Sequence, residues 1–275
     1  MTQRVLEWVT GRLQEGETVA LASVINAQGS VPGKPGAHMA LTSAEMFGTV
    51  GGAGLEAKVL NHLREILSTG EGRVETYQLQ RESKGKIGTP LNSLCGGIVT
   101  VAMEIIHPMP HVLLAGGGHC AQAIADASAS LGWNFSVLDT RSEYANEDLW
   151  PDAEECVAAQ PNEFLSRETT ESLSRFSHVL LLGHDWEIDQ TLLIGLLQRC
   201  EQRPRIGCIG SKSKWLAFEK SALDSGIPQK AIDSVICPIG INIGAESPQE
   251  IAIAVLAEII ADLKGVDSYS SSWRQ

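Results

Sequence analysis

The first hundred residues combine two kinds of hydrophobic pattern. Apolar residues alternate with other residues over 98–106, which predicts a strand with one buried face. Residues 18–25 are almost continuously apolar, as in a strand that is covered on both sides. Leu55, Val59 and Leu63 recur at the spacing of one helical face. Together these patterns predict a small α+β domain.

From residue 112 onwards, short apolar runs alternate with helical patterns. The runs are Val112–Ala115, Val137–Asp139, His178–Leu182 and Arg205–Ile209. This order predicts an α/β fold, in which a Rossmann-like parallel sheet carries helices on both faces. Two prolines within residues 107–110 mark a linker between the two patterns. We therefore expect an N-terminal α+β domain over residues 1–107 and a Rossmann-like domain over residues 108–275.

A glycine-rich loop follows the first of these apolar runs. In a dinucleotide-binding unit, Gly116 would form the tight turn and Gly118 would let a phosphate approach the backbone. Asp139 lies where a ribose-binding carboxylate is expected, and an acid there favours NAD over NADP. His119 either points into the crevice or only closes the turn. An NAD(P)-dependent oxidoreductase is thus one interpretation, although no hydride-transfer partner is identifiable.

Other polar residues follow the ends of the remaining predicted strands. They are Arg141, His184, Asp185, Ser211 and Lys212. Ligands of parallel sheets bind at the carboxyl ends of the strands, so these residues could face the same crevice as the glycine loop. Asp185 fits a helix N-cap equally well. A metal site would need more ligands than His184 and its neighbouring acids supply.

The N-terminal part has its own glycine-rich segments. Gly51 and Gly52 directly precede a predicted helix, whose first N–H groups could bind an anion. Glu56 falls in the first turn of that helix, where it complements the helix dipole, and this structural role is favoured over a catalytic one. Residues 26–36 are rich in glycine and proline and are predicted to form a loop, either functional or merely connecting.

Cysteine usage and charge narrow the possible classes of function. None of the six cysteines forms a CxxC pair, so a structural zinc site is not expected. Cys95 precedes Gly96 and Gly97 on a glycine turn, where a thiol would be accessible; the alternative is a partly buried thiol without a role. The net charge of −12 argues against nucleic-acid binding but allows a small anionic ligand. No apolar run is long enough for a membrane span and no signal-peptide core is found, so we expect a cytoplasmic protein without a membrane partner.

Several short motifs, taken in order, resemble one family. They are Gly29–Pro32, Gly48–Glu56, Leu94–Gly97, Gly116–His119, Asp139–Arg141, His184-Asp185, Ile209–Lys212, Cys237–Gly240 and Ser247–Ala252. The combination spans nearly the whole chain and resembles the xanthine dehydrogenase accessory proteins of the XdhC/CoxI type. Many members of that family carry a cysteine at the position of Ala53, which leaves Cys95 as the better thiol candidate in this chain.

The resemblance implies a cofactor chaperone rather than a turnover enzyme. Such a protein would bind the molybdenum cofactor (molybdopterin), assist its sulfuration by a cysteine desulfurase and deliver it to the apo-enzyme of a molybdenum hydroxylase. We also expect a homodimer. Cys95 would offer molybdenum a soft sulfur ligand. The residues expected to hold the cofactor are Cys95, Gly96, Gly97, Gly51, Gly52, Glu56, Gly116, Gly118, His119, Asp139, Arg141, His184, Asp185, Ser211 and Lys212.

Overall fold

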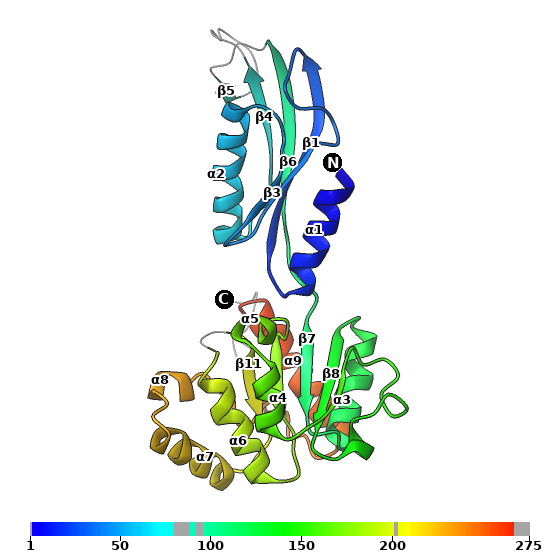
Figure 1. Cartoon of the computed structure of the whole chain (residues 1–275), viewed down its shortest axis with the longest axis vertical. Coiled ribbons are helices and arrows are strands. Elements are labelled where there is room, and N and C mark those ends of the chain that lie inside the picture. The colour runs from blue at the N-terminus through cyan, green and yellow to red at the C-terminus, as the bar shows by residue number, and fades with distance from the viewer. Residues whose placement is uncertain (1, 80–88, 92–95, 201–202, 267–275) are drawn as a thin grey trace. The chain divides into compact units, whose positions relative to one another are not determined.

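The structure is a computed structural model in which the chain forms two compact units (Figure 1). It describes residues 2–79, 89–91, 96–200 and 203–266 of the 275. Along the chain, the first unit ends at Pro108 and the second begins at Met109, one residue beyond the expected boundary. Among the described residues, no helix has the length and apolar character needed to cross a membrane.

The N-terminal unit is built on a six-stranded sheet in the order β3-β2-β1-β6-β4-β5. Its elements are α1 (Thr2–Gln14), β1 (Val19–Gly29), β2 (His38–Leu41), β3 (Met46–Gly48), α2 (Ala53–Thr69), β4 (Arg73–Leu79), β5 (Thr89–Leu91) and β6 (Gly97–Ile106). All neighbouring strands are antiparallel except β4 and β5. The loop predicted over residues 26–36 is wrong at its start, because β1 stays paired with β6 as far as Gly29 and Gly97 after a register shift near Val24.

Each face of this sheet is covered by one helix. On one face, Val59, Leu63 and Ile66 of α2 are fully buried against β1, β2, β4 and β6. On the other face, Val5 and Val9 of α1 pack on β1 and β2. The spacing of these residues along each helix is that of a single apolar face, which explains why both segments are helical here. The prediction of a smaller α+β unit at this end of the chain is confirmed.

The C-terminal unit contains a five-stranded parallel sheet in the order β11-β10-β7-β8-β9. Its strands are β7 (His111–Ala115), β8 (Asn134–Asp139), β9 (Cys156–Ala158), β10 (His178–Leu181) and β11 (Arg205–Cys208). Its helices are α3 (His119–Ser130), the short 3₁₀ helix η1 (Ser142–Tyr144), α4 (Pro161–Arg167), α5 (Thr170–Leu173), α6 (Trp186–Leu197), α7 (Lys212–Asp224), α8 (Gln229–Ile232) and α9 (Pro248–Leu263). The alternation of strand and helix is that of a Rossmann-like fold, as predicted.

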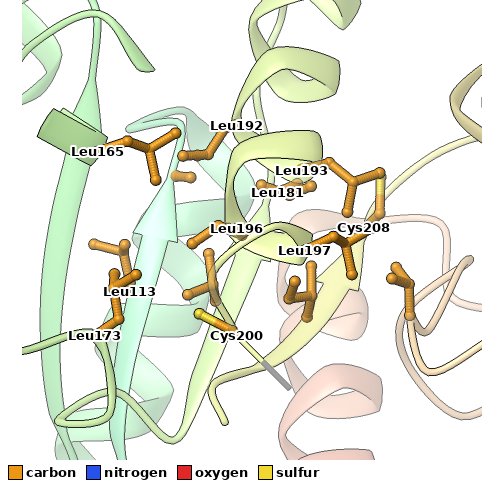
Figure 2. Close-up of a cluster of buried hydrophobic side chains, with 14 of the residues drawn as sticks. Leu113, Leu165, Leu173, Leu181, Leu192, Leu193, Leu196, Leu197, Cys200 and Cys208 are labelled. Carbon is orange, nitrogen blue, oxygen red and sulfur yellow. The ribbon is translucent and has the colours of Figure 1, made fainter. Parts of the chain in front are cut away.

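Two hydrophobic cores lie on opposite faces of the parallel sheet. Leu113 and Leu181 face α4, α6 and α7 in the cluster that Figure 2 shows. Leu114 and Leu180, their neighbours along the same strands, face α3 and α9. Successive side chains of a strand point to opposite faces, so a strand covered on both sides must be apolar throughout. This requirement explains the uninterrupted apolar runs in the sequence.

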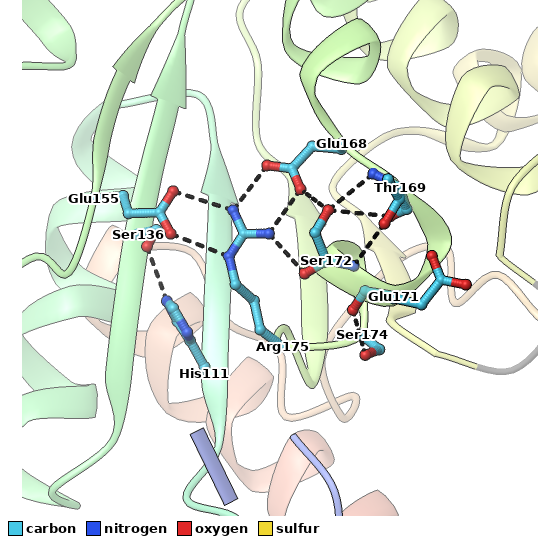
Figure 3. A network of polar contacts seen from close by, with 9 residues as sticks. All are labelled: His111, Ser136, Glu155, Glu168, Thr169, Glu171, Ser172, Ser174 and Arg175. Carbon is cyan, nitrogen blue, oxygen red and sulfur yellow. Dashed lines mark hydrogen bonds and ion pairs between the residues drawn. The ribbon is translucent and has the colours of Figure 1, made fainter. Parts of the chain in front are cut away.

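A polar network ties α4 and α5 to the sheet (Figure 3). The Arg175 guanidinium donates to Glu155 at 3.0 and 3.1 Å and to Glu168 at 2.7 and 2.8 Å, and it lies 4.1 Å from the centroid of the Phe176 ring. His111, at the start of β7, hydrogen-bonds Ser136 at 2.8 Å. Burial, aided by the charge of Arg175, lowers the pKa of His111 to about 4. His111 is therefore neutral in the folded unit at pH 7.

Candidate functional site

The glycine loop and the start of α3 form the first part of the site. Gly116 has φ +116°, and a Cβ there would lie 2.7 Å from the Gly183 nitrogen, so this position requires glycine. A Cβ on Gly118 would meet nothing within 4 Å. Gly118 is also the N-cap of α3, and no side chain caps this helix. No side chain therefore competes with a ligand for the first N–H groups of α3, as an anion-binding helix end requires.

The carboxylate of Asp139, at the end of β8, accepts four hydrogen bonds within the protein. One carboxylate oxygen accepts from Gly117 N at 2.9 Å and from the Arg141 guanidinium at 2.9 Å. The other accepts from the backbone N and the Nε of Arg141, both at 3.0 Å. Although burial opposes them, these hydrogen bonds hold the pKa of Asp139 below its ordinary value. A carboxylate accepts about four hydrogen bonds, so a ribose hydroxyl would have to displace one of these donors.

Arg141 is held on both sides. Its guanidinium is paired with Asp139 and lies 3.7 Å from the centroid of the Tyr144 ring. The hydrogen bonds with Asp139 raise the pKa of Arg141. The carbonyl oxygen of Tyr144 lies close to Gly117, since a Cβ on Gly117 would be 2.2 Å from that oxygen. Arg141 thus fixes the loop that borders the glycine turn.

A small pocket lies at the carboxyl ends of β7, β8 and β10. The predicted site residues that line it are Gly116, Asp139, His184 and Asp185. Gly118, His119, Arg141, Ser211 and Lys212 are not among its lining residues, and His119 is exposed. The structure therefore brings together only some of the residues expected at this crevice.

Helix capping explains two of the predicted site residues. Asp185 caps α6 and accepts a hydrogen bond from Glu187 N at 2.8 Å. Ser211 caps α7 and accepts from Lys214 N at 3.3 Å. Among the described residues, no group of three or more His, Cys, Asp or Glu side chains is placed to hold a metal ion.

Asp189, one of the acids beside His184, lines the pocket and forms an ion pair with Lys214 that the sequence did not predict. The Asp189 side chain is 2% exposed and accepts from Gly183 N at 3.2 Å and from Lys214 Nζ at 2.7 Å. Lys214 Nζ also donates to the Ile209 carbonyl at 3.1 Å. The available signal was an acid on the apolar face of α6, four residues after its N-cap. Lys214, 25 residues away, follows another predicted strand end, but nothing in the sequence indicated that it pairs with Asp189.

In the N-terminal unit, the glycine motifs interlock. A Cβ on Gly33 would lie 2.1 Å from the Val50 carbonyl oxygen, and one on Gly51, at φ +128°, would lie 2.7 Å from Gly33 N. Gly97 is equally confined, since its Cβ would lie 2.4 Å from the Gln28 carbonyl oxygen. Close backbone packing thus accounts for Gly51 and Gly97. By contrast, Gly52 and Gly96 are exposed.

Glu56 forms part of a hydrogen-bonded helix start. Glu56 lies in the first turn of α2 and accepts a short hydrogen bond from Thr49 Oγ1, which in turn accepts from Gly51 N at 3.1 Å. This arrangement agrees with a structural role for Glu56. Cys95, the expected thiol ligand of molybdenum, lies outside the described residues.

Comparisons with known proteins cover both units. Residues 112–259 match the model of the XdhC Rossmann domain, and residues 12–78 match the model of the XdhC and CoxI family. The chain is 28% identical to the uncharacterized protein YqeB of Escherichia coli (strain K12) over 241 residues, which are 88% of this chain and 43% of that protein. It is 32% identical to a probable xanthine dehydrogenase subunit of Bacillus subtilis (strain 168) over 166 residues, which are 60% of this chain and 46% of that protein.

The chain thus spans less than half the length of either relative. Among solved structures, it is similar to the crystal structure of a xanthine dehydrogenase from Bacillus halodurans. The identity is 20%, the TM-score is 0.49, and the alignment covers 99% of this chain and 98% of the other.

Proposed function

The chain belongs to the XdhC and CoxI family, and from this membership we propose that it is an accessory protein of a xanthine dehydrogenase-type molybdenum hydroxylase. In this role it binds the molybdenum cofactor, assists its sulfuration and delivers it to the apo-enzyme. The description of the Bacillus subtilis relative as a probable xanthine dehydrogenase subunit supports the choice of partner. A cysteine desulfurase, as the source of sulfur, and a homodimeric state are further parts of the proposal.

The structural observation that supports cofactor binding is the uncapped start of α3 beside Gly118. When bound, the cofactor supplies a molybdenum centre and a pterin with a phosphate group. The open space at Gly118 and the N–H groups of α3 suit such a phosphate without any net positive charge of the chain. These residues would hold the phosphate.

The hydrogen bonds that Asp139 already accepts favour this cofactor over NAD. A dinucleotide site uses the acid after the second strand to accept hydrogen bonds from ribose hydroxyls. Here Arg141 and Gly117 already fill the acceptor positions of that acid. A ligand that presents only a phosphate to the glycine loop leaves this pairing intact, so it loses no hydrogen bonds on binding.

Reconstitution of an apo-hydroxylase tests the proposed role. A xanthine dehydrogenase-type hydroxylase lacking its cofactor is incubated anaerobically with cysteine desulfurase and either free cofactor or cofactor preloaded on this chain. We expect faster and more complete recovery of hydroxylase activity from the preloaded chain. Equal recovery from free cofactor, or from cofactor mixed with serum albumin, would exclude a delivery role.

A further inference from the structure

Two cysteines from distant parts of the sequence, Cys208 and Cys237, lie side by side at the carboxyl end of β11. Gly207 and Ile236 form a parallel bridge, directly before Cys208 and Cys237. Cys208 N donates to the Ile236 carbonyl at 2.8 Å, and Ile239 N donates to the Cys208 carbonyl at 3.0 Å, so the backbone contacts flank Cys237 on both sides. Bridged backbones lie about 4.8 Å apart. That spacing is within the Cα separation of about 4.4–6.8 Å that a disulfide spans.

The two thiols are in contact but differ in accessibility. Cys208 Sγ donates to the Ile209 carbonyl oxygen at 3.5 Å, and its side chain lies within hydrogen-bond reach of Cys237. Cys208 is 0% exposed, within the core between the sheet and α6 and α7. Cys237 is half-buried and lines a groove with Gly210, Pro238 and Ile241. Of the two, Cys237 is the more accessible, so a small molecule reaches Cys237 first, and Cys208 only through Cys237.

The charges around the pair favour a thiolate at the accessible position. The hydrogen bond from Cys208 lowers the pKa of Cys237, burial opposes this, and the Lys214 ammonium lowers it further. The pKa of Cys208 is raised by its hydrogen bond with Cys237 and by burial. Lys214 is itself fixed by Asp189 and the Ile209 carbonyl. Of the two thiols, Cys237 therefore loses its proton more readily, and Cys208 keeps its proton.

We propose that Cys237 and Cys208 form a thiol–disulfide exchange site for low-molecular-weight disulfides, of which glutathione disulfide is an example. The Cys237 thiolate attacks one sulfur of the small disulfide, which releases one thiolate and leaves a mixed disulfide on Cys237. Cys208 then attacks the Cys237 sulfur and gives its proton to the second leaving thiol. The small disulfide is reduced to two thiols, and the cysteine pair is oxidised to a Cys208–Cys237 disulfide. This site does not depend on whether the chain binds the molybdenum cofactor.

The first test measures reactivity and connectivity in the full-length wild-type chain. Pulse alkylation with iodoacetamide at pH 7, followed by peptide mass spectrometry, gives a rate for each cysteine. We expect Cys237 to react about tenfold faster than Cys120 and Cys156, because thiolates are the reactive form and burial raises the pKa of both of those thiols. After exposure to excess glutathione disulfide, a linked peptide pair containing Cys208 and Cys237 is expected. Equal alkylation rates, or the absence of the linked pair, would overturn the proposal.

The second test separates the two steps with single substitutions. In Cys208→Ser, glutathione disulfide is expected to leave a stable mixed disulfide on Cys237; Cys208→Ala repeats the test if the serine variant does not fold. In Cys237→Ser, no adduct is expected on Cys208, because that thiol is buried. In Lys214→Met, alkylation of Cys237 should slow severalfold. An adduct on Cys208 in Cys237→Ser would contradict the assigned order of attack.

Discussion

The Asp189–Lys214 ion pair gives the sharpest stability prediction. It joins the first turns of α6 and α7 behind the carboxyl ends of β10 and β11, and the Asp189 side chain is 2% exposed. Replacing Lys214 with Met removes the ammonium but leaves the carboxylate buried, with the Gly183 N–H still donating to it. Breaking a buried pair on one side costs about 3–5 kcal/mol. We expect Lys214→Met to lose an amount in this range at pH 8.

The loss should depend on pH in a defined direction. Burial raises the pKa of Asp189, and the hydrogen bond and charge of Lys214 oppose that rise. Without Lys214 the folded-state pKa rises further above the unfolded-state value of about 4. A group with a raised folded-state pKa stabilises the folded state below its unfolded-state pKa and loses that contribution as pH rises. The penalty in Lys214→Met should therefore be largest at pH 8 and shrink towards pH 5.

Urea unfolding measured by tryptophan fluorescence tests this reasoning. In a Trp8→Phe background, the described tryptophans that remain all lie in the C-terminal unit, so their signal reports on that unit. The matched control is the double variant Asp189→Asn with Lys214→Met, which removes the charge but keeps an acceptor for Gly183 N–H. We expect the double variant to lose less than half of what Lys214→Met loses. A loss below about 1 kcal/mol in Lys214→Met, or one independent of pH, would refute the account, because exposed pairs contribute no more than that.

Three further predictions concern the scaffold. Folding lowers the pKa of His111 from 6.5 to about 4, so the unfolded chain binds more protons between these pH values. Through this residue, the wild type should lose about 3 kcal/mol of unfolding free energy from pH 7 to pH 4. In urea unfolding at each pH, His111→Asn should lose correspondingly less. Arg175→Met should lower the unfolding free energy of the C-terminal unit by about 3–5 kcal/mol, because two carboxylates lose their partner. Arg167→Met, which breaks an exposed pair, should change that free energy by less than about 1 kcal/mol in the same assay. Gly116→Ala should lower the thermal midpoint and Gly118→Ala should leave it nearly unchanged, since only Gly116 combines a positive φ with a crowded Cβ position.

The hydrophobic pattern was sufficient for the architecture. Continuous apolar runs indicated strands covered on both faces, and the helical spacing of Leu55 to Leu63 indicated the helix on the first sheet. The predicted loop began too early, at residue 26. Its prediction rested on glycine and proline content, which does not distinguish the end of a paired strand from a loop. The pairing of Gly29 with Gly97 depends on a partner strand some 70 residues away.

The candidate site was predictable only in part. The sequence pattern locates Asp139 and the glycine loop, but it does not say that Arg141 turns back onto the acid. Asp185 was correctly offered as a helix cap, since its side chain needs only the local backbone. The contacts of Asp189 with Lys214 and of Cys208 with Cys237 join residues that only the parallel sheet brings together. No local signal in the sequence reports such contacts.

Retention of molybdenum by the purified chain tests the central proposal most directly. The full chain is incubated anaerobically with molybdenum cofactor and passed through a gel-filtration column, and molybdenum and oxidised pterin are measured in the protein peak. We predict stoichiometric retention by the wild type and by Gly11→Ala, where a Cβ also meets nothing within 4 Å. Retention should be lost in Gly118→Val, which fills the space beside α3, and weakened in Cys95→Ala. No molybdenum in the wild-type peak, or an equal amount in Gly118→Val, would contradict the proposal that this helix start holds the cofactor.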